Sequence, residues 1–128
     1  MYPVPKIFGE NNENKNQDPR TARGDSLIIH EWKGSGPPYM HVHYKDDEAW
    51  HVLEGTLLFT FPDKKVEVTK GATVLVPAGL PHTYTALEGS RYLMILTPAL
   101  DRLIAELHKT PIKDHGEVLK KYDSEIVK

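Results

Sequence analysis

Short runs of β-branched and aromatic residues fill the chain between residues 27 and 96. In residues 56–61, Leu57, Phe59 and Phe61 recur at every second position, which is the period of a strand with one buried face. Glycine, proline and aspartate interrupt the runs at short intervals. Many short strands separated by such residues are typical of an all-β sandwich or barrel. The expected strands cover residues 27–32, 40–44, 49–53, 56–61, 65–69, 73–76, 82–86 and 92–96.

The pattern changes after Pro98, which closes the strand region. Apolar residues then recur at the spacing of one helical face, at Leu100, Leu103, Ile104 and Leu107. Asp114 is expected to cap a second helix that runs through Tyr122. The sequence therefore predicts three segments in one domain: an N-terminal arm or loop in residues 1–25, a β-barrel in residues 26–97 and a helical tail in residues 98–128.

Composition narrows the range of functions. The chain has 128 residues, of which 39% are hydrophobic and 27% charged, and this fits one ordinary globular domain. A formal net charge of −2, without a long run of one sign, argues against nucleic acid or an anionic membrane surface as the main partner. We expect a cytoplasmic location, because the sequence has no signal peptide pattern and no window near the roughly 20 apolar residues of a membrane span. Without cysteine, any metal site must use histidine and carboxylate ligands.

Four residues stand out as candidate metal ligands. His41 and His43 are two positions apart in an expected strand, so both imidazoles point to one face and can chelate one ion. Glu48 opens the next apolar run after a polar turn, and its carboxylate can face back toward the pair. His82 begins the strand after a Pro/Gly turn, and an antiparallel barrel can bring it beside the first two histidines. Each feature alone is common in proteins without a metal, but their combined spacing indicates a metal site.

The segments around these residues resemble the two motifs of the cupin superfamily. The quoted segments are His41-x-His43-x4-Glu48-x6-Gly55 and Gly71-x5-Pro77-x-Gly79-x2-His82. Two positions depart from the usual pattern. Gly36 is one residue closer to His41 than the glycine of the family pattern, and Ala86 stands where the family often has asparagine. Neither position is a metal ligand in the family, so the departures leave the implied ligand set intact.

The resemblance implies a fold and a ligand set. The fold would be an all-β cupin jelly-roll barrel (a double-stranded β-helix) of about six to eight strands, with short C-terminal helices. His41, His43, Glu48 and His82 would bind one divalent metal ion, which could be Fe, Mn, Ni, Cu or Zn. One or two positions on the ion would stay open for water, substrate or dioxygen. Small cupins often form homodimers, so a homodimer is expected, with the N-terminal arm reaching the partner.

Strand alternation predicts the residues of a substrate pocket. The residues expected to face inward are Tyr39, Trp50, Phe59, Tyr84 and Met94. Aromatic walls with polar tips suit a flat or partly apolar small molecule, although the same residues are often core filling in a small barrel. We expect His51 on the surface or in an interface, Arg91 in a surface salt bridge, and His108 and His115 in solvent.

Three functions are compatible with such a site. The chain resembles quercetin dioxygenase-like cupins, which implies a metal-dependent oxidoreductase acting on a small organic substrate, with Glu48 as ligand and general base. The first alternative is a metal-dependent isomerase or lyase that stabilises an enediolate of a sugar or keto acid. The second is a non-enzymatic sensor or small-molecule binding module. Oxygen uptake would support the oxidoreductase, and proton exchange without oxygen use would support the isomerase or lyase. Binding without turnover would support the sensor or binding module.

Overall fold

The computed structural model describes residues 2–9 and 20–128, and these residues form mainly antiparallel β-structure. The strands are β1 (Thr21–Arg23), β2 (Ile28–Trp32), β3 (His41–His43), β4 (Glu48–Glu54), β5 (Thr56–Phe61), β6 (Lys64–Thr69), β7 (Thr73–Val76), β8 (Thr83–Ala86), β9 (Arg91–Leu96) and β10 (Ser124–Ile126). The helices are α1 (Pro98–His108), a 3-10 turn η1 (Ile112–Asp114) and α2 (His115–Lys120). None of the helices in the described part of the chain is long and apolar enough to cross a membrane.

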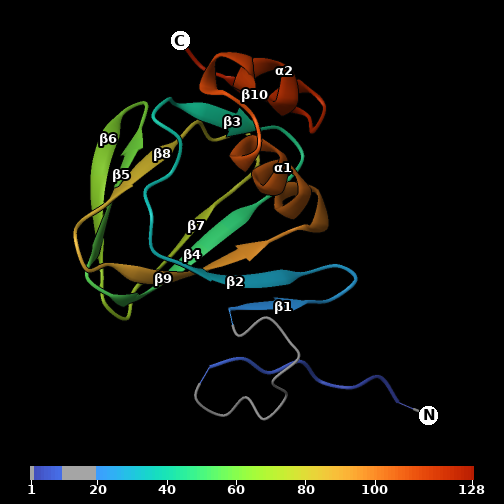
Figure 1. Ribbon diagram of the computed structural model, residues 1–128. Coiled ribbons are helices and arrows are strands. Elements are labelled where there is room, and N and C mark those ends of the chain that lie inside the picture. The colour runs from blue at the N-terminus through green and yellow to red at the C-terminus, as the bar shows by residue number, and fades with distance from the viewer. Residues whose placement is uncertain (1, 10–19) are drawn as a thin grey trace.

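The strands pair in two main sheets and one two-stranded ribbon. The larger sheet has the order β1-β2-β9-β4-β7, the smaller has the order β6-β5-β8, and β10 pairs with β3. All of these pairings are antiparallel. Figure 1 shows the β6-β5-β8 sheet against one side of the larger sheet, with both helices beside the β10–β3 ribbon. The predicted all-β jelly-roll barrel with short C-terminal helices is therefore confirmed.

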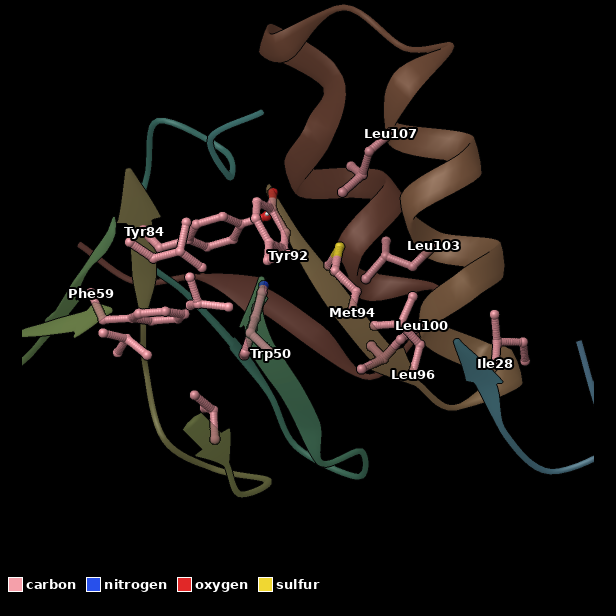
Figure 2. Packing of buried hydrophobic residues seen from close by; sticks show 14 of the residues in the cluster. Ile28, Trp50, Phe59, Tyr84, Tyr92, Met94, Leu96, Leu100, Leu103 and Leu107 are labelled. Carbon is pink, nitrogen blue, oxygen red and sulfur yellow. Dashed lines mark hydrogen bonds between the residues drawn. The ribbon is translucent and has the colours of Figure 1, made fainter. Parts of the chain in front are cut away.

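The hydrophobic core lies between the two sheets and continues beneath α1. Along β5, Leu57, Phe59 and Phe61 are buried, while the alternate residues are partly exposed, as the period-two pattern predicts. Figure 2 shows aromatic residues of the barrel at one end of this cluster and leucines of α1 at the other. The labelled residues are Ile28, Trp50, Phe59, Tyr84, Tyr92, Met94, Leu96, Leu100, Leu103 and Leu107.

The first helix forms where the apolar spacing predicts it. The Thr97 side chain accepts a hydrogen bond from the Leu100 N–H (3.2 Å), and Pro98 occupies the first turn, so the N-terminus of α1 is well capped. The second helix is shorter than expected, because it ends at Lys120 and Asp114 makes no side-chain capping bond. Strands β1 and β10 were not predicted from the sequence. Residues 2–9 form no strand, and the rest of the expected N-terminal arm, apart from residues 20–25, lies outside the described residues.

Gly55 makes the tight turn between β4 and β5. Its φ is 80°, in the left-handed region that favours glycine. A Cβ at this position would lie 2.7 Å from the Cα of Ser90, which is buried and bonds the backbone N–H and carbonyl of Thr56 through its hydroxyl. The turn therefore needs glycine for its backbone conformation and also for the close approach of Ser90.

Replacing Gly55 with alanine is expected to destabilise the protein more than the same change at Gly71. Gly71 also has a positive φ, 87°, but a Cβ there would meet no other atom within 4 Å, so Gly71→Ala incurs only the backbone strain of about 1–2 kcal/mol. Gly55→Ala adds an overlap with Ser90, which costs about 1–3 kcal/mol more. Urea unfolding of the two variants measures the difference. Equal losses of stability would show that the approach of Ser90 is not a constraint.

Candidate metal centre

Three backbone segments bring the predicted ligands to one place. His41 and His43 lie on β3, two positions apart, and Glu48 is the first residue of β4. The backbones of His41 and His82 bond each other in both directions, with N–O distances of 3.1 and 2.9 Å. This bridge sets His82 beside the first histidine, as expected for an antiparallel barrel.

Two contacts between turns fix the position of β3 relative to the second motif. The Gly79 N–H donates to the carbonyl of His43 (2.7 Å), and the Ala78 N–H donates to a carboxylate oxygen of Asp47 (2.8 Å). The turn before Glu48 is therefore tied to the turn before His82. Gly79 of the second motif thus has a local structural role beside the candidate ligands.

The four side chains form a compact, buried cluster. One ring nitrogen from each of His41, His43 and His82 lies within 4.8 Å of the corresponding atoms of the other two. The Glu48 Oε1 lies 3.2 Å from the Nε2 of His43 and 3.4 Å from the Nε2 of His82. All four residues are at most 5% exposed. A cluster of this size and burial is a candidate metal site, with donor types that suit a first-row divalent ion.

The other ring nitrogen of each histidine determines which atom faces the centre. The Nδ1 of His41 lies 3.3 Å from the carbonyl of Tyr39, and the Nδ1 of His82 lies 3.0 Å from the carbonyl of Leu80. A carbonyl oxygen can only accept, so the Nδ1 atoms of these two rings donate. Their Nε2 atoms then present lone pairs to the centre in the neutral rings.

Ser124 performs the same task for His43 from the far end of the chain. Its hydroxyl lies 3.1 Å from the carbonyl of Tyr122, to which it donates, and 2.8 Å from the Nδ1 of His43. With its single proton directed at Tyr122, the hydroxyl oxygen accepts the proton of His43. Pairing of β10 with β3 places Ser124 directly opposite His43. The C-terminal strand therefore orients a candidate ligand, in the way outer partners usually orient metal-binding histidines.

The electrostatics of the cluster suit a cation. Burial lowers the pKa of His41 to about 3, with smaller contributions from His82 and His43, so this ring is neutral at neutral pH. Burial alone would raise the pKa of Glu48, but the imidazoles of His43 and His82, when they carry a proton on Nε2, outweigh it and lower the pKa to about 2. Within the described residues, the buried Glu48 Oε1 and His82 Nε2 have no hydrogen-bond partner. Buried acceptors without partners are costly, and a bound cation would satisfy them.

A cavity of about 370 Å³ opens onto His41, His43 and Glu48. Trp50, Tyr84 and Met94 line it, as expected from strand alternation. The other two expected pocket residues are not among the lining residues. Tyr39 packs edge-on against the His41 ring, and Phe59 packs against Trp50 and Tyr84 in the core. Further apolar wall comes from β9 and α1, namely from Leu96, Leu100, Leu103, Ile104, Ala105 and Leu107.

His115 was expected in solvent, and this expectation is wrong. The residue is 8% exposed and lines the cavity. Its Nε2 lies 3.1 Å from the carbonyl of Leu107 and 2.9 Å from the carbonyl of Thr110, so this nitrogen donates. Its Nδ1 then accepts the hydroxyl proton of Tyr39 at 2.7 Å. His115 thus links the end of α1 to the loop before β3, and these contacts, which are distant in sequence, explain its burial.

The remaining singled-out residues lie away from the cluster centre. The Nδ1 of His51 lies 2.7 Å from the hydroxyl of Thr73, away from the four candidate ligands. His108 is exposed and stacks on Trp32 near the cavity mouth, with ring centroids 5.3 Å apart. The predicted salt bridge of Arg91 is confirmed, because its guanidinium lies 3.0 Å from a carboxylate oxygen of Glu31.

Comparison with known proteins identifies the family. A family model described as the cupin domain matches residues 27–97, which is more than half of the chain. The chain therefore belongs to the cupin family. An uncharacterized protein of Methanocaldococcus jannaschii is 42% identical over 43 residues, which span 34% of this chain and 34% of that relative.

Solved structures share the fold at low sequence identity. Protein NMB1881 of Neisseria meningitidis has a TM-score of 0.53 at 20% identity, over 61% of this chain and 81% of that one. KdgF of a Halomonas species has a TM-score of 0.54 at 23% identity, over 72% and 94% of the two chains. Pac13 of Streptomyces, described as a nucleoside dehydratase, has a TM-score of 0.57 at 12% identity, over 84% and 72%. At these identities the likeness shows the fold alone.

Ser124→Ala is expected to weaken metal binding about 10- to 100-fold, because it removes the acceptor that orients His43. Glu125→Ala is the matched control on the same strand. It removes the bond from the Tyr44 hydroxyl to Glu125 and leaves His43 untouched. Competition with a chelator measures the Zn²⁺ affinity of both variants. If the two lose affinity equally, strand pairing rather than the Ser124 hydroxyl orients the site.

The metal-free protein is expected to lose stability as the pH falls below about 6.5. The pKa of His41 is about 3 in the folded state and 6.5 in the unfolded chain, so below pH 6.5 the unfolded state binds more protons. The slope for one such proton is about 1.4 kcal/mol per pH unit. Glu48 adds to the loss only below pH 4.5, since its pKa shifts from 4.5 to about 2 on folding. Urea unfolding in EDTA at several pH values measures the profile.

The variant His41→Asn removes the group responsible for the first part of this profile. Its stability is expected to depend less steeply on pH between 6.5 and 4.5 than that of the wild type. A wild-type profile that stays flat over this interval would contradict the assignment to His41.

Proposed function

We propose that the protein is a metal-dependent oxidoreductase of the dioxygenase-like class, which acts on a small, partly apolar organic molecule. The observation that supports this is a buried cluster of three histidines and a carboxylate at the inner end of a largely apolar cavity. In this proposal His41, His43, Glu48 and His82 hold one divalent ion. Substrate enters from the side of α1, where the leucines of the cavity wall lie.

The proposed ligand set leaves room for chemistry on the ion. Three neutral imidazoles and one carboxylate reduce a dication to a net charge of +1, which favours an anionic substrate group. With five or six ligands in total, one or two positions remain for substrate or dioxygen. When bound, the ion would supply Lewis acidity toward a substrate oxygen and a site for reaction with dioxygen.

The residues of the chain have separate tasks in this proposal. Glu48 is ionised and lies at the cavity, so it can accept a proton from an acidic C–H or O–H of the substrate. Leu100 and Leu103 contact the apolar part of the substrate and exclude water from the reacting end. Dioxygen is the co-reactant, and both of its oxygen atoms are incorporated into the products.

The first test is the metal content of the purified protein. About one divalent ion per chain is expected for the wild type, and a His41→Ala, His82→Ala double variant is expected to hold almost none, because two of four ligands are removed. His51→Ala is the control, since this histidine lies outside the cluster. Elemental analysis on all three proteins measures the ratio. A wild type with no more metal than the double variant would refute the metal site.

The second test is oxygen uptake by metal-loaded protein with flavonol and diketone substrates. Uptake that is lost in the double variant is the expected result. Proton exchange into a keto acid without oxygen use would instead assign the site to an isomerase or lyase. Ligand binding without any turnover would assign it to a binding module. Either of these two results, with the metal confirmed, overturns the oxidoreductase proposal.

A further inference from the structure

The cavity reaches the surface of the molecule at a few of its lining residues. Those that are exposed are Arg23 of β1, Trp32 of β2, Ser35 of the following loop, and Ala105 and His108 of α1. The candidate metal ligands at the other end of the cavity are buried. The exposed lining residues therefore mark the places where a molecule could pass between solvent and the cluster.

The loop after β2 is closed against β8 by hydrogen bonds. The Ala86 N–H donates to the hydroxyl oxygen of Ser35 (2.9 Å), and the Gly36 N–H donates to the carbonyl of Tyr84 (3.1 Å). A molecule that entered here would have to break bonds to the backbone of β8, which costs free energy. This loop is therefore a wall of the cavity.

Side-chain contacts join β1 and β2 to α1 on the other side. The Nε of Arg23 lies 3.2 Å from a carboxylate oxygen of Asp101, and these two side chains are 56% and 25% exposed. The ring of His108 stacks on Trp32, with the centroids 5.3 Å apart. Exposed pairs of this kind contribute little stability, and their side chains can rearrange without any change in the backbone.

The two pairs are held apart by the geometry of the helix and of the strand. Asp101 and His108 are seven residues apart on α1, so they share a face and lie about 10 Å apart along its axis. Arg23 is paired with Ile28, which lies four residues, or about 13 Å, before Trp32 on β2. The two pairs therefore bound a window between β2 and α1 that is about 10 Å long.

The frame of this window is rigid. Leu100 and Leu103 are each 1% exposed, and Figure 2 shows them packed toward Met94 and Leu96 of β9. Strand β2 pairs with β1 on one side and with β9 on the other. Lifting α1 would expose its leucines to water, so passage through the window depends on the side chains within it.

Ala105 lies near the middle of the window. It is four residues after Asp101 and three before His108, on the same face of α1, and it lines the cavity. Its methyl group fills little space, and the neighbouring Ile104 also lines the cavity. A longer side chain at position 105 would occupy the space through which solvent reaches the cavity.

We propose that the window between β2 and α1 is the entrance to the cavity, with Ala105 as the residue that determines which molecules pass and the Trp32–His108 stack as its movable edge. The inference rests on the proposed function in one respect, namely that the cavity receives a small organic molecule. The charges of Arg23 and Asp101 offset each other, so the entrance selects by shape and favours a flat, apolar body.

An entrance residue and a wall residue have different kinetic signatures. A narrower entrance raises the barrier between the free and the bound state, so it slows association and dissociation by the same factor and leaves Kd unchanged. A wall residue contacts the bound molecule, and its replacement changes Kd mainly through the dissociation rate. Rates measured in both directions therefore distinguish the entrance from a wall.

The dye ANS, an anilinonaphthalene sulfonate, is the probe, because its fluorescence rises on apolar surfaces. Stopped-flow mixing with the metal-free protein gives both rates. Ala105→Leu keeps a strong helix former and is expected to slow association and dissociation about 10- to 100-fold, with Kd changed by less than about 3-fold. Ala105→Ser, which adds little volume, is expected to keep the wild-type rates. Shifts of the methyl NMR signals of Leu100 and Leu103 locate the dye in the cavity.

His108→Ala is expected to act in the opposite direction. It removes the stack on Trp32, so association and dissociation of ANS should both become several-fold faster at nearly constant Kd. Arg102→Ala is the matched control on α1, because Arg102 is exposed and does not line the cavity. Equal rates in these two variants would show that the stack is not part of the entrance.

A single thiol allows the window to be filled after the protein has folded. The chain contains no cysteine, so Ala105→Cys carries one thiol at this position. Benzyl methanethiosulfonate attaches a benzyl group to it through a disulfide, and dithiothreitol removes the group again. ANS association is expected to slow on modification and to recover on reduction. This measurement does not depend on the folding of Ala105→Leu.

Several outcomes would overturn the proposal. Unchanged ANS rates after modification of Ala105→Cys contradict it, and so does a change in Kd that arises from dissociation alone. Methyl signals of Leu100 and Leu103 that do not move with ANS show that the dye does not enter the cavity by this window. All of these measurements use metal-free protein, so they are separate from the metal analysis and from oxygen uptake. Failure of those two tests together with the expected ANS rates would refute the oxidoreductase and leave the entrance supported.

Discussion

Three ring protons that point away from the centre of the barrel determine what the buried cluster can do. The Nδ1 atoms of His41 and His82 face carbonyl oxygens, and that of His43 faces a hydroxyl whose own proton is already used. The Nε2 atoms therefore meet as acceptors, next to the ionised carboxylate of Glu48. Acceptors gathered in a buried space do not stabilise one another, so the free energy of this arrangement depends on what binds there.

The same constraint explains why the C-terminal tail matters to a site formed by the barrel. Ser124 comes from β10 and orients His43, and His115 comes from α2 and holds the hydroxyl of Tyr39, two residues before His41. Both contacts join positions more than 70 residues apart. The tail therefore covers the barrel and also holds both histidines of β3 in place. A change in the packing of α2 would reach the candidate ligands through these two hydrogen bonds.

The sequence was sufficient for features that depend on local pattern. The strands from β2 to β9 follow period-two alternation and Gly/Pro turns, so their positions were predicted to within a residue or two. Strand β10 was missed because Ser124–Ile126 is short and gains its partner only through contact with β3. His115 was misplaced for the same reason: its burial depends on Tyr39 and Leu107, which no local pattern brings together. Tyr39 and Phe59 share the expected face but do not line the cavity, since alternation fixes direction and not distance.

The barrel and the helix contribute different properties to the site. Donor atoms come from β3, β4 and the start of the segment leading into β8, where backbone pairing allows little adjustment. Much of the cavity wall comes from α1, whose Leu100, Leu103 and Leu107 pack as side chains on one helical face. A single substitution changes the shape of a wall made of side chains, whereas it leaves the backbone positions of paired strands largely unchanged. In the proposed function, selection among small molecules would therefore depend mainly on α1, while the capacity to hold a cation would depend on the strands.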